Sequence, residues 1–292
     1  MRINLTLGLK TWLLLLAMAV VLAGCSRINL AYRNLDLLVA WSLDDYLDLN
    51  RQQQARLRER LREHLAWHCR TQLPDDLDAL QRVRQQIRQG ELDERAIRSH
   101  YEDIRQAIQS VAVEITPTTV QLLRELDERQ VSQLAEALAR DHQEHLEKYL
   151  AAPLPQQIRE RAERMGERVE QWLGKLDAAQ RQRIRVWAHT LGEQNRLWLE
   201  NRRHWQLALL EALSDRHEAE FEQHIVRLLQ ERESMDTDAY RAALAHSENA
   251  TIALISDLYA LSDAQQRRHL DNRLQRLGND LGSLDCLPAP PA

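Results

Sequence analysis

The apolar residues of this chain recur with the period of an α-helix over almost its whole length. Between residues 93 and 115, for example, Ile97, Tyr101, Ile104 and Ile108 follow one another at intervals of three or four residues. This spacing places them on one face of a helix. Leu, Ala, Arg, Gln and Glu dominate the composition, and we find no apolar–polar alternation bounded by turns. The sequence therefore predicts an all-α protein, a multi-helix bundle of long amphipathic helices.

Scarce Gly and Pro residues set the expected helix boundaries. Pro74 suits a first helical turn, whereas Gly90 and Gly174 can each end a helix. The domain is expected to be continuous or to divide near residue 153, where two prolines occur. The expected helices cover residues 28–46, 51–73, 74–89, 93–115, a short helix opened by Thr116 and Pro117, 127–152, 156–173, 177–213, 215–233, 237–260 and 262–282.

The longest expected helix, 177–213, carries apolar positions that repeat every seven residues. Ile184, Leu191, Trp198 and Trp205 follow this spacing, which turns one face of the helix toward a neighbour. Core packing is the favoured interpretation of this aromatic stripe. A groove that binds a partner is the alternative.

Four segments share a pattern of Leu, a helix-capping residue and, three residues after the cap, Gln. In such a capping box the cap side chain accepts a hydrogen bond from the third helical N–H, and the Gln side chain accepts one from the N–H of the cap. The pattern therefore predicts four helix starts. The pairs of cap and glutamine are Asn50 and Gln53, Asp127 and Gln130, Asp177 and Gln180, and Ser262 and Gln265.

The first residues predict export and lipid attachment. Arg2 and Lys10 supply positive charge around an apolar run at 11–21, which is shorter than the roughly 20 apolar residues that cross a bilayer. The run ends in Leu22-Ala23-Gly24-Cys25, which resembles a bacterial lipobox. The resemblance implies that residues 1–24 are a cleaved lipoprotein signal peptide and that Cys25 carries a covalent lipid. An ordinary signal peptide or an uncleaved anchor is the alternative.

Ser26, and not Asp, follows the lipidation cysteine. By resemblance to Gram-negative lipoproteins, this residue implies an anchor in the outer membrane that faces the periplasm. The helical periplasmic domain is expected to comprise residues 25–283, and a disordered Pro-rich tail to comprise 284–292.

Removal of the signal peptide takes away two positive charges and changes the formal net charge from -5 to -7. Arg, Asp and Glu are interspersed throughout the remaining chain. This dispersed pattern is typical of solvated helix surfaces and not of a nucleic-acid footprint, so we expect no nucleic-acid partner.

After lipidation of Cys25, the remaining cysteines are Cys69 and Cys286. A pair of cysteines in an oxidising compartment favours a disulfide, which would join the tail to the second helix. Two free thiols too far apart to meet are the alternative.

Three expected helices each carry two histidines on an apolar side. The two members of a pair are three, four or seven residues apart, so they share one stripe, as metal and haem sites in helical bundles require. Interhelical hydrogen bonding or a partly exposed position at the edge of the core is the favoured interpretation, and a metal or haem site is the alternative. The pairs are His64 and His68, His142 and His145, and His217 and His224.

Enzyme signatures are missing from the sequence. It contains no Gly-x-Ser-x-Gly segment, no Gly-rich phosphate loop and no His-Glu-x-x-His motif. The neighbouring carboxylates Asp44 and Asp45, and Asp75, Asp76 and Asp78, could serve acid–base chemistry. Interaction with helix dipoles explains them more simply. We therefore expect no enzymatic activity and no cofactor other than the covalent lipid.

Several motifs occur in a fixed order along the chain: the Gly-Cys-Ser lipobox, Ala-Tyr-Arg-Asn at 31–34, Asp-Asp-Tyr-Leu-Asp-Leu at 44–49 and Trp-His-Cys-Arg-Thr-Gln-Leu-Pro at 67–74. Together they resemble a family of Gram-negative lipoproteins catalogued as a domain of unknown function. The resemblance implies an envelope location, lipidation and a helical fold. The four Leu-cap-x-x-Gln segments also resemble the Leu-Thr-x-x-Gln motif of small periplasmic chaperones of the Spy and CpxP type.

The leading functional hypothesis is a membrane-anchored, non-enzymatic lipoprotein that binds protein partners or unfolded clients in the cell envelope. Amphipathic helices rich in Arg and Gln can present grooves to extended or helical segments. The alternatives are a metal- or haem-binding helical bundle and a structural spacer between membrane and cell wall.

Overall fold

The computed structural model describes Tyr32 and residues 34–284, and every regular element in this part of the chain is a helix. The all-α prediction is therefore confirmed. None of the described helices is long and apolar enough to cross a membrane. The helices are α2 (Leu35–Asp44), α3 (Arg51–Thr71), α4 (Leu73–Gln89), α5 (Glu94–Arg124), α6 (Glu128–Leu150), α7 (Leu154–Leu173), α8 (Ala178–Thr190), α9 (Gln194–Ser214), α10 (Phe221–Gln230), the 3₁₀ turn η1 (Arg232–Met235), α11 (Asp238–Ala260) and α12 (Ala264–Gly282).

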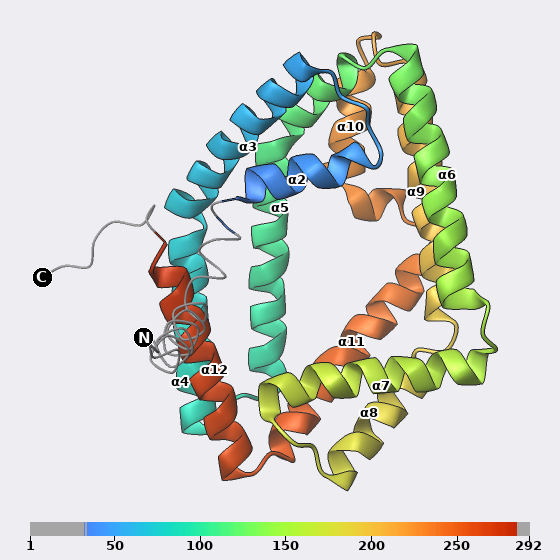
Figure 1. Cartoon of the computed structure of the whole chain (residues 1–292). Helices are drawn as coiled ribbons and strands as arrows, with labels where there is room; N and C mark the ends of the chain where they lie inside the picture. Colours follow the sequence, from blue (N-terminus) through green and yellow to red (C-terminus); the bar gives the residue numbers. More distant parts are fainter. Residues whose placement is uncertain (1–31, 33, 285–292) are drawn as a thin grey trace, which may run out of the picture.

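The helices of the bundle are arranged as the sides of an open frame (Figure 1). One side contains α3, α4, α5 and α12, a second contains α6 and α9, and a third contains α7, α8 and α11. Segments far apart in the chain pack side by side, since α12 contacts α4, α10 contacts α5, and α6 contacts α9.

The apolar core is divided into separate clusters, as the frame requires. The largest cluster joins α3, α5, α6, α9 and α10, and includes Leu57, Leu123 and Phe221. A second cluster joins α7, α8 and α11, and a third joins α4, α5, α11 and α12. A small fourth cluster packs Cys69 and Leu73 against Leu284, beyond the end of α12. Burial of each large apolar side chain stabilises the fold by about 1.5–3 kcal/mol, so each cluster fixes its own set of helices.

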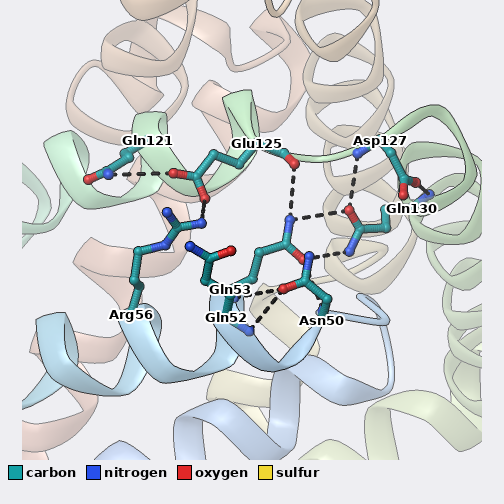
Figure 2. A network of polar contacts seen from close by, with 8 residues as sticks. All are labelled: Asn50, Gln52, Gln53, Arg56, Gln121, Glu125, Asp127 and Gln130. Carbon is teal, nitrogen blue, oxygen red and sulfur yellow. Dashed lines mark hydrogen bonds and ion pairs between the residues drawn. The ribbon is translucent and has the colours of Figure 1, made fainter.

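Two of the predicted capping boxes meet at one corner of the frame, where α3 and α6 begin (Figure 2). Asn50 and Asp127 cap these helices, and the side chains of Gln53 and Gln130 complete the boxes. Each glutamine amide donates to the oxygen of the other, at 3.3 and 2.8 Å. Their remaining donors reach the carbonyl oxygens of Glu125 and Asp48. The two buried amides thereby fill their entire hydrogen-bonding capacity.

A second amide pair joins the starts of α8 and α12. The Gln180 and Gln266 side chains donate to each other at 2.9 and 3.0 Å. The cap of α12 is Asp263, with Gln266 at the third helical position, so the prediction of Ser262 and Gln265 was wrong by one residue. The Ser262 hydroxyl instead donates to the carbonyl of Leu258 in the preceding turn.

The predicted helix break at Thr116 and Pro117 does not occur, because α5 continues through Pro117 to Arg124. Proline in a helix interior costs about 3 kcal/mol. The last turns of α5 bury Val120 and Leu123 in the largest core cluster, which offsets this cost. The longest described helix is therefore α5, with 31 residues.

The expected helix at 177–213 is instead two helices, α8 and α9, with a break at residues 191–193. Gly192 lies in the break with a φ of +47°, in the left-handed region that favours glycine. The buried Arg161 guanidinium of α7 donates to the carbonyls of Ala188 and Gly192, at 3.0 and 3.1 Å. A cation at the carbonyl end of α8 interacts favourably with the helix dipole and stabilises the break.

The predicted apolar stripe of this region is consequently shared between two cores. Ile184 and Leu191 belong to the second cluster, whereas Trp205 packs against the largest one. Trp198 lies edge-on to the Tyr149 ring of α6, with ring centroids 5.6 Å apart. These contacts agree with the core-packing interpretation of the stripe.

Candidate functional site

A groove of about 540 Å³ lies between α4 and α5, and we call it the α4–α5 groove. Its apolar lining comes from both helices, three residues from each. Its polar lining includes carboxylates, an arginine and a histidine. The apolar residues are Ala79, Leu80, Val83, Ile104, Ala107 and Ile108, and the principal polar residues are Asp75, Asp76, Arg82, His100 and Asp103.

The apolar stripe predicted on α5 is only partly buried. Ile97 belongs to a core cluster, but the next two isoleucines, Ile104 and Ile108, are 58% and 64% exposed. These two residues share the predicted helix face with Ile97 but stay accessible, because α4 covers only one side of them across the groove. Two large β-branched side chains in contact with water leave apolar surface that a partner could cover.

The carboxylates of the groove give it an acidic end. Asp75 and Asp76 lie in the first turn of α4, where the helix dipole stabilises negative charge. Burial raises the pKa of Asp76, with a further rise from Asp75 that the nearby His68 partly opposes. Asp103 on α5 is 3.6 Å from the Arg82 guanidinium, which compensates one of the three charges. The groove therefore keeps an excess of negative charge near neutral pH.

His100 lines the groove, and its ring bonds to Gln86 of α4. Its Nε2 lies 2.7 Å from the Gln86 amide oxygen, so Nε2 carries the proton and donates. Burial lowers the pKa of His100, which favours the neutral ring with an unprotonated Nδ1. This Nδ1 is buried and has no hydrogen-bond partner among the described residues; it lies 3.8 Å from Asp103.

A second hollow, of about 420 Å³, lies between α7 and α8. Ile158, Ala162 and Ile184 form part of its lining. Its charged lining is balanced, because three arginines accompany three glutamates; Arg181 pairs with Glu170 at 2.8 Å. This hollow lacks both the exposed isoleucines and the charge excess of the α4–α5 groove, which is therefore the stronger candidate site.

In the first predicted pair, His64 and His68, each histidine bonds to different residues. His64 on α3 bridges to α5, with Nδ1 3.0 Å from Glu114 and Nε2 2.8 Å from Thr118. His68 accepts or donates a hydrogen bond with the Tyr32 hydroxyl at 3.1 Å. Both rings of this pair thus bond to residues outside their own helix, as the favoured interpretation proposed.

The other two pairs also differ from a ligand set. His145 bonds to the Asp141 carbonyl at 2.7 Å and packs beside Trp198. Burial and the neighbouring arginines of α9 lower the pKa of His142. His217 lies before α10 in a turn and not in a helix with His224, so the predicted shared helix face was wrong. Among the described residues, no three His, Cys, Asp or Glu side chains gather to hold a metal ion.

Of the three cysteines with predicted roles, the structure describes only Cys69. Cys69 is fully buried in the small cluster with Leu73 and Leu284, and it is disulfide-bonded. Cys286, its predicted partner, and Cys25, the predicted lipidation site, both lie outside the described residues. The Cys69–Cys286 pair and the lipid on Cys25 therefore stay predictions. The position of Leu284 beside Cys69 brings the start of the tail close to it.

Sequence reasoning missed the groove itself. The sequence contained two signals of the groove. The apolar stripe of α5 continues through Ile104 and Ile108, and the preceding helix, α4, begins with the carboxylates Asp75 and Asp76. Only the packing of α4 against α12 reveals that α4 leaves part of α5 uncovered.

The fold defines an all-α, multi-helix protein with an acidic, partly apolar groove. A model of a family of unknown function, DUF6279, matches residues 45–241. This match spans more than half of the chain, and the chain therefore belongs to that family. No match was found among curated proteins or among solved structures.

Proposed function

We propose that this protein is a lipid-anchored, non-enzymatic binding protein of the Gram-negative outer membrane, facing the periplasm, that holds partner or client segments in the α4–α5 groove. The observation that carries the proposal is the exposure of Ile104 and Ile108 within a groove of about 540 Å³. The lipobox-like segment ending in Cys25 supports the location.

The chemistry of the groove indicates what kind of segment it binds. Apolar side chains can cover the isoleucines, which removes their surface from water. The excess of carboxylates favours donors such as Lys, Arg and amide N–H groups. The occupant is therefore a segment of an envelope protein that combines apolar and basic side chains, in extended or helical form.

Peptide binding provides the test. Two labelled peptides of equal length, one with alternating Leu and Lys and one with alternating Leu and Glu, are titrated with the full-length lipidated protein in detergent, and fluorescence anisotropy is recorded. The basic peptide should bind more tightly, and its affinity should fall with salt because exposed charges are screened.

Variants connect binding to the groove. Replacement of both Ile104 and Ile108 by Gln should raise the Kd at least about tenfold, since each isoleucine contributes about 1 kcal/mol on half-burial. Val113→Gln is the matched control, because Val113 is 50% exposed on the same helix but does not line the groove. Asp75→Asn with Asp76→Asn should reduce the preference for the basic peptide.

The possible results separate the parts of the proposal. Equal binding of the two peptides would reject the basic partner but keep the binding role. Equal loss of affinity in the isoleucine variant and the Val113 control would place binding elsewhere. If neither peptide binds and the protein does not suppress aggregation of an unfolded outer-membrane porin, the binding function is wrong.

A further inference from the structure

The first described helix, α2, carries an unusual exposed face. Leu35, Leu37, Leu38 and Trp41 are all exposed, and Trp41 has 71% of its surface accessible. No other described helix exposes four large apolar side chains within seven residues. Monomeric proteins seldom leave such contiguous apolar surface without a function.

The opposite side of α2 is fixed on the frame. Asp36 is buried and pairs with Arg62 of α3, at 2.9 Å between Nε and Oδ2. Leu43 packs against the largest core cluster. These contacts hold the orientation of α2, so its apolar face is presented to the surroundings by a rigid base and not by a free segment.

We infer that this face of α2 lies on the phospholipid surface and acts as a second membrane contact beside the covalent lipid. The inference rests on the proposed anchor at Cys25. Only nine residues lie between Cys25 and Leu35, so the two residues are at most about 35 Å apart. The anchor therefore keeps α2 within a short distance of the bilayer surface.

The composition of the face and of the tether fits a lipid surface. Leu inserts into the boundary of the acyl chains, and Trp is enriched at the level of the headgroups. The exposed carboxylates Asp44 and Asp45, which anionic headgroups repel, lie at the C-terminal end of the helix, after the four apolar residues. In the sequence, the charged residues between Cys25 and Leu35 are Arg27 and Arg33, which can pair with anionic headgroups.

This contact would fix how the frame lies on the membrane. A lipid on Cys25 restricts the distance of the frame from the bilayer but does not by itself set the orientation of the frame. A helix face in the same interface adds a second attachment and restricts rotation, so one side of the frame always faces the bilayer.

Tryptophan quenching tests the inference. The full-length lipidated protein is reconstituted into vesicles of phosphatidylethanolamine and phosphatidylglycerol with brominated acyl chains, which quench tryptophans that lie in the interface. Trp41→Phe should remove most of the quenchable fluorescence. Trp172→Phe is the matched control, because Trp172 is 37% exposed on α7 and is covered by Arg273; it should leave the quenched fraction unchanged.

A second variant keeps Trp41 and changes its neighbours. Leu37→Ser with Leu38→Ser should reduce quenching of Trp41 at least about twofold, because less apolar area enters the interface. Circular dichroism confirms the fold of each variant. Unchanged quenching in both variants would overturn the inference.

Two further measurements separate the remaining explanations. If sedimentation shows a dimer that Trp41→Ser converts to a monomer, the face binds a second copy and the inference is wrong. Mass spectrometry of the N-terminus tests the anchor independently. Unacylated protein whose vesicle binding still depends on Trp41 would support the face and reject the anchor, whereas acylated protein without Trp41 quenching would keep the anchor and reject the face.

Discussion

The buried amide pair of Gln53 and Gln130 offers a direct test of how the corners of the frame are held. Both side chains are 2% exposed, and both amides use two donors and two acceptors. Gln130→Leu removes four bonds at once. The Asp127 N–H and the Asp48 carbonyl lose their partners, at 3.0 and 2.7 Å, and the Gln53 amide loses one donor and one acceptor contact.

The expected cost follows from where these groups lie. The two contacts on Gln53 are buried, and each unsatisfied group there costs about 1–3 kcal/mol. Water can reach the other two groups, which reduces their cost, and the apolar leucine regains part of the loss. We therefore expect a destabilisation of about 3–4 kcal/mol, a large part of the stability of an ordinary domain.

Urea unfolding followed by far-UV circular dichroism measures the effect. Gln52→Leu is the matched control, since Gln52 is the exposed neighbour of Gln53 on the same turn and should change stability by less than about 0.5 kcal/mol. Gln53→Leu combined with Gln130→Leu should cost at least about 1 kcal/mol less than the sum of the single variants, because the two amides no longer leave each other unsatisfied. A cost below about 1 kcal/mol for Gln130→Leu, or strict additivity, would refute this account.

Two further predictions concern charged groups inside the frame. Burial alone would raise the pKa of Asp271, but hydrogen bonds from Arg84 and Arg88 hold it below its ordinary value. A carboxylate with a lowered folded-state pKa stabilises the fold above its unfolded pKa of about 3.9 and loses this contribution as the pH falls through the folded value. The urea midpoint should therefore drop less below pH 4 in Asp271→Asn than in the wild type; equal drops would contradict the assignment. Arg161→Met should destabilise the protein by about 2–3 kcal/mol and speed hydrogen exchange in the last turn of α8, and unchanged exchange there would contradict the capping role.

Local signals in the sequence were sufficient for most helix starts. The caps Asn50, Asp127 and Asp177 were predicted correctly because a capping box involves only four consecutive residues. The fourth box shows the limit of such reasoning. Ser262 and Asp263 can both cap, and a glutamine follows each at the third position. Asp263 is used in the structure because this choice brings Gln266 against Gln180, a contact between residues 86 positions apart.

Tertiary contacts decided where sequence rules failed. Thr116 and Pro117 were expected to open a new helix, but the core contacts of the following turns keep α5 continuous. Gly192 was expected inside a helix, but the distant Arg161 stabilises a break there. The candidate groove escaped prediction for a similar reason. Periodicity shows which residues of α5 share a face, but it does not show whether a neighbouring helix covers Ile104 and Ile108.

The two glutamine pairs reveal a repeated construction that no single segment of the sequence displays. Around the Gln53–Gln130 pair, α3 and α6 start together, and α5 ends where α6 begins. Around the Gln180–Gln266 pair, α8 and α12 start together, and α11 ends where α12 begins. In each pair, one glutamine amide donates to a backbone carbonyl two residues before the cap of the partner helix. Gln130 reaches the carbonyl two residues before the Asn50 cap, and Gln266 reaches Lys175, two residues before the Asp177 cap.

The repeated joints explain how an open frame can be stable. A frame buries less apolar surface than a solid bundle, so the angles between its sides need another source of rigidity. Each joint, meaning one pair of buried glutamine amides, links two helix starts through mutual hydrogen bonds, which are directional, unlike apolar contacts. One joint lies where α3 meets α6 and the other where α8 meets α12, at two corners of the frame (Figure 1). The helix α5 can then run between two core clusters with its middle turns uncovered, and this uncovered stretch is where the groove lies.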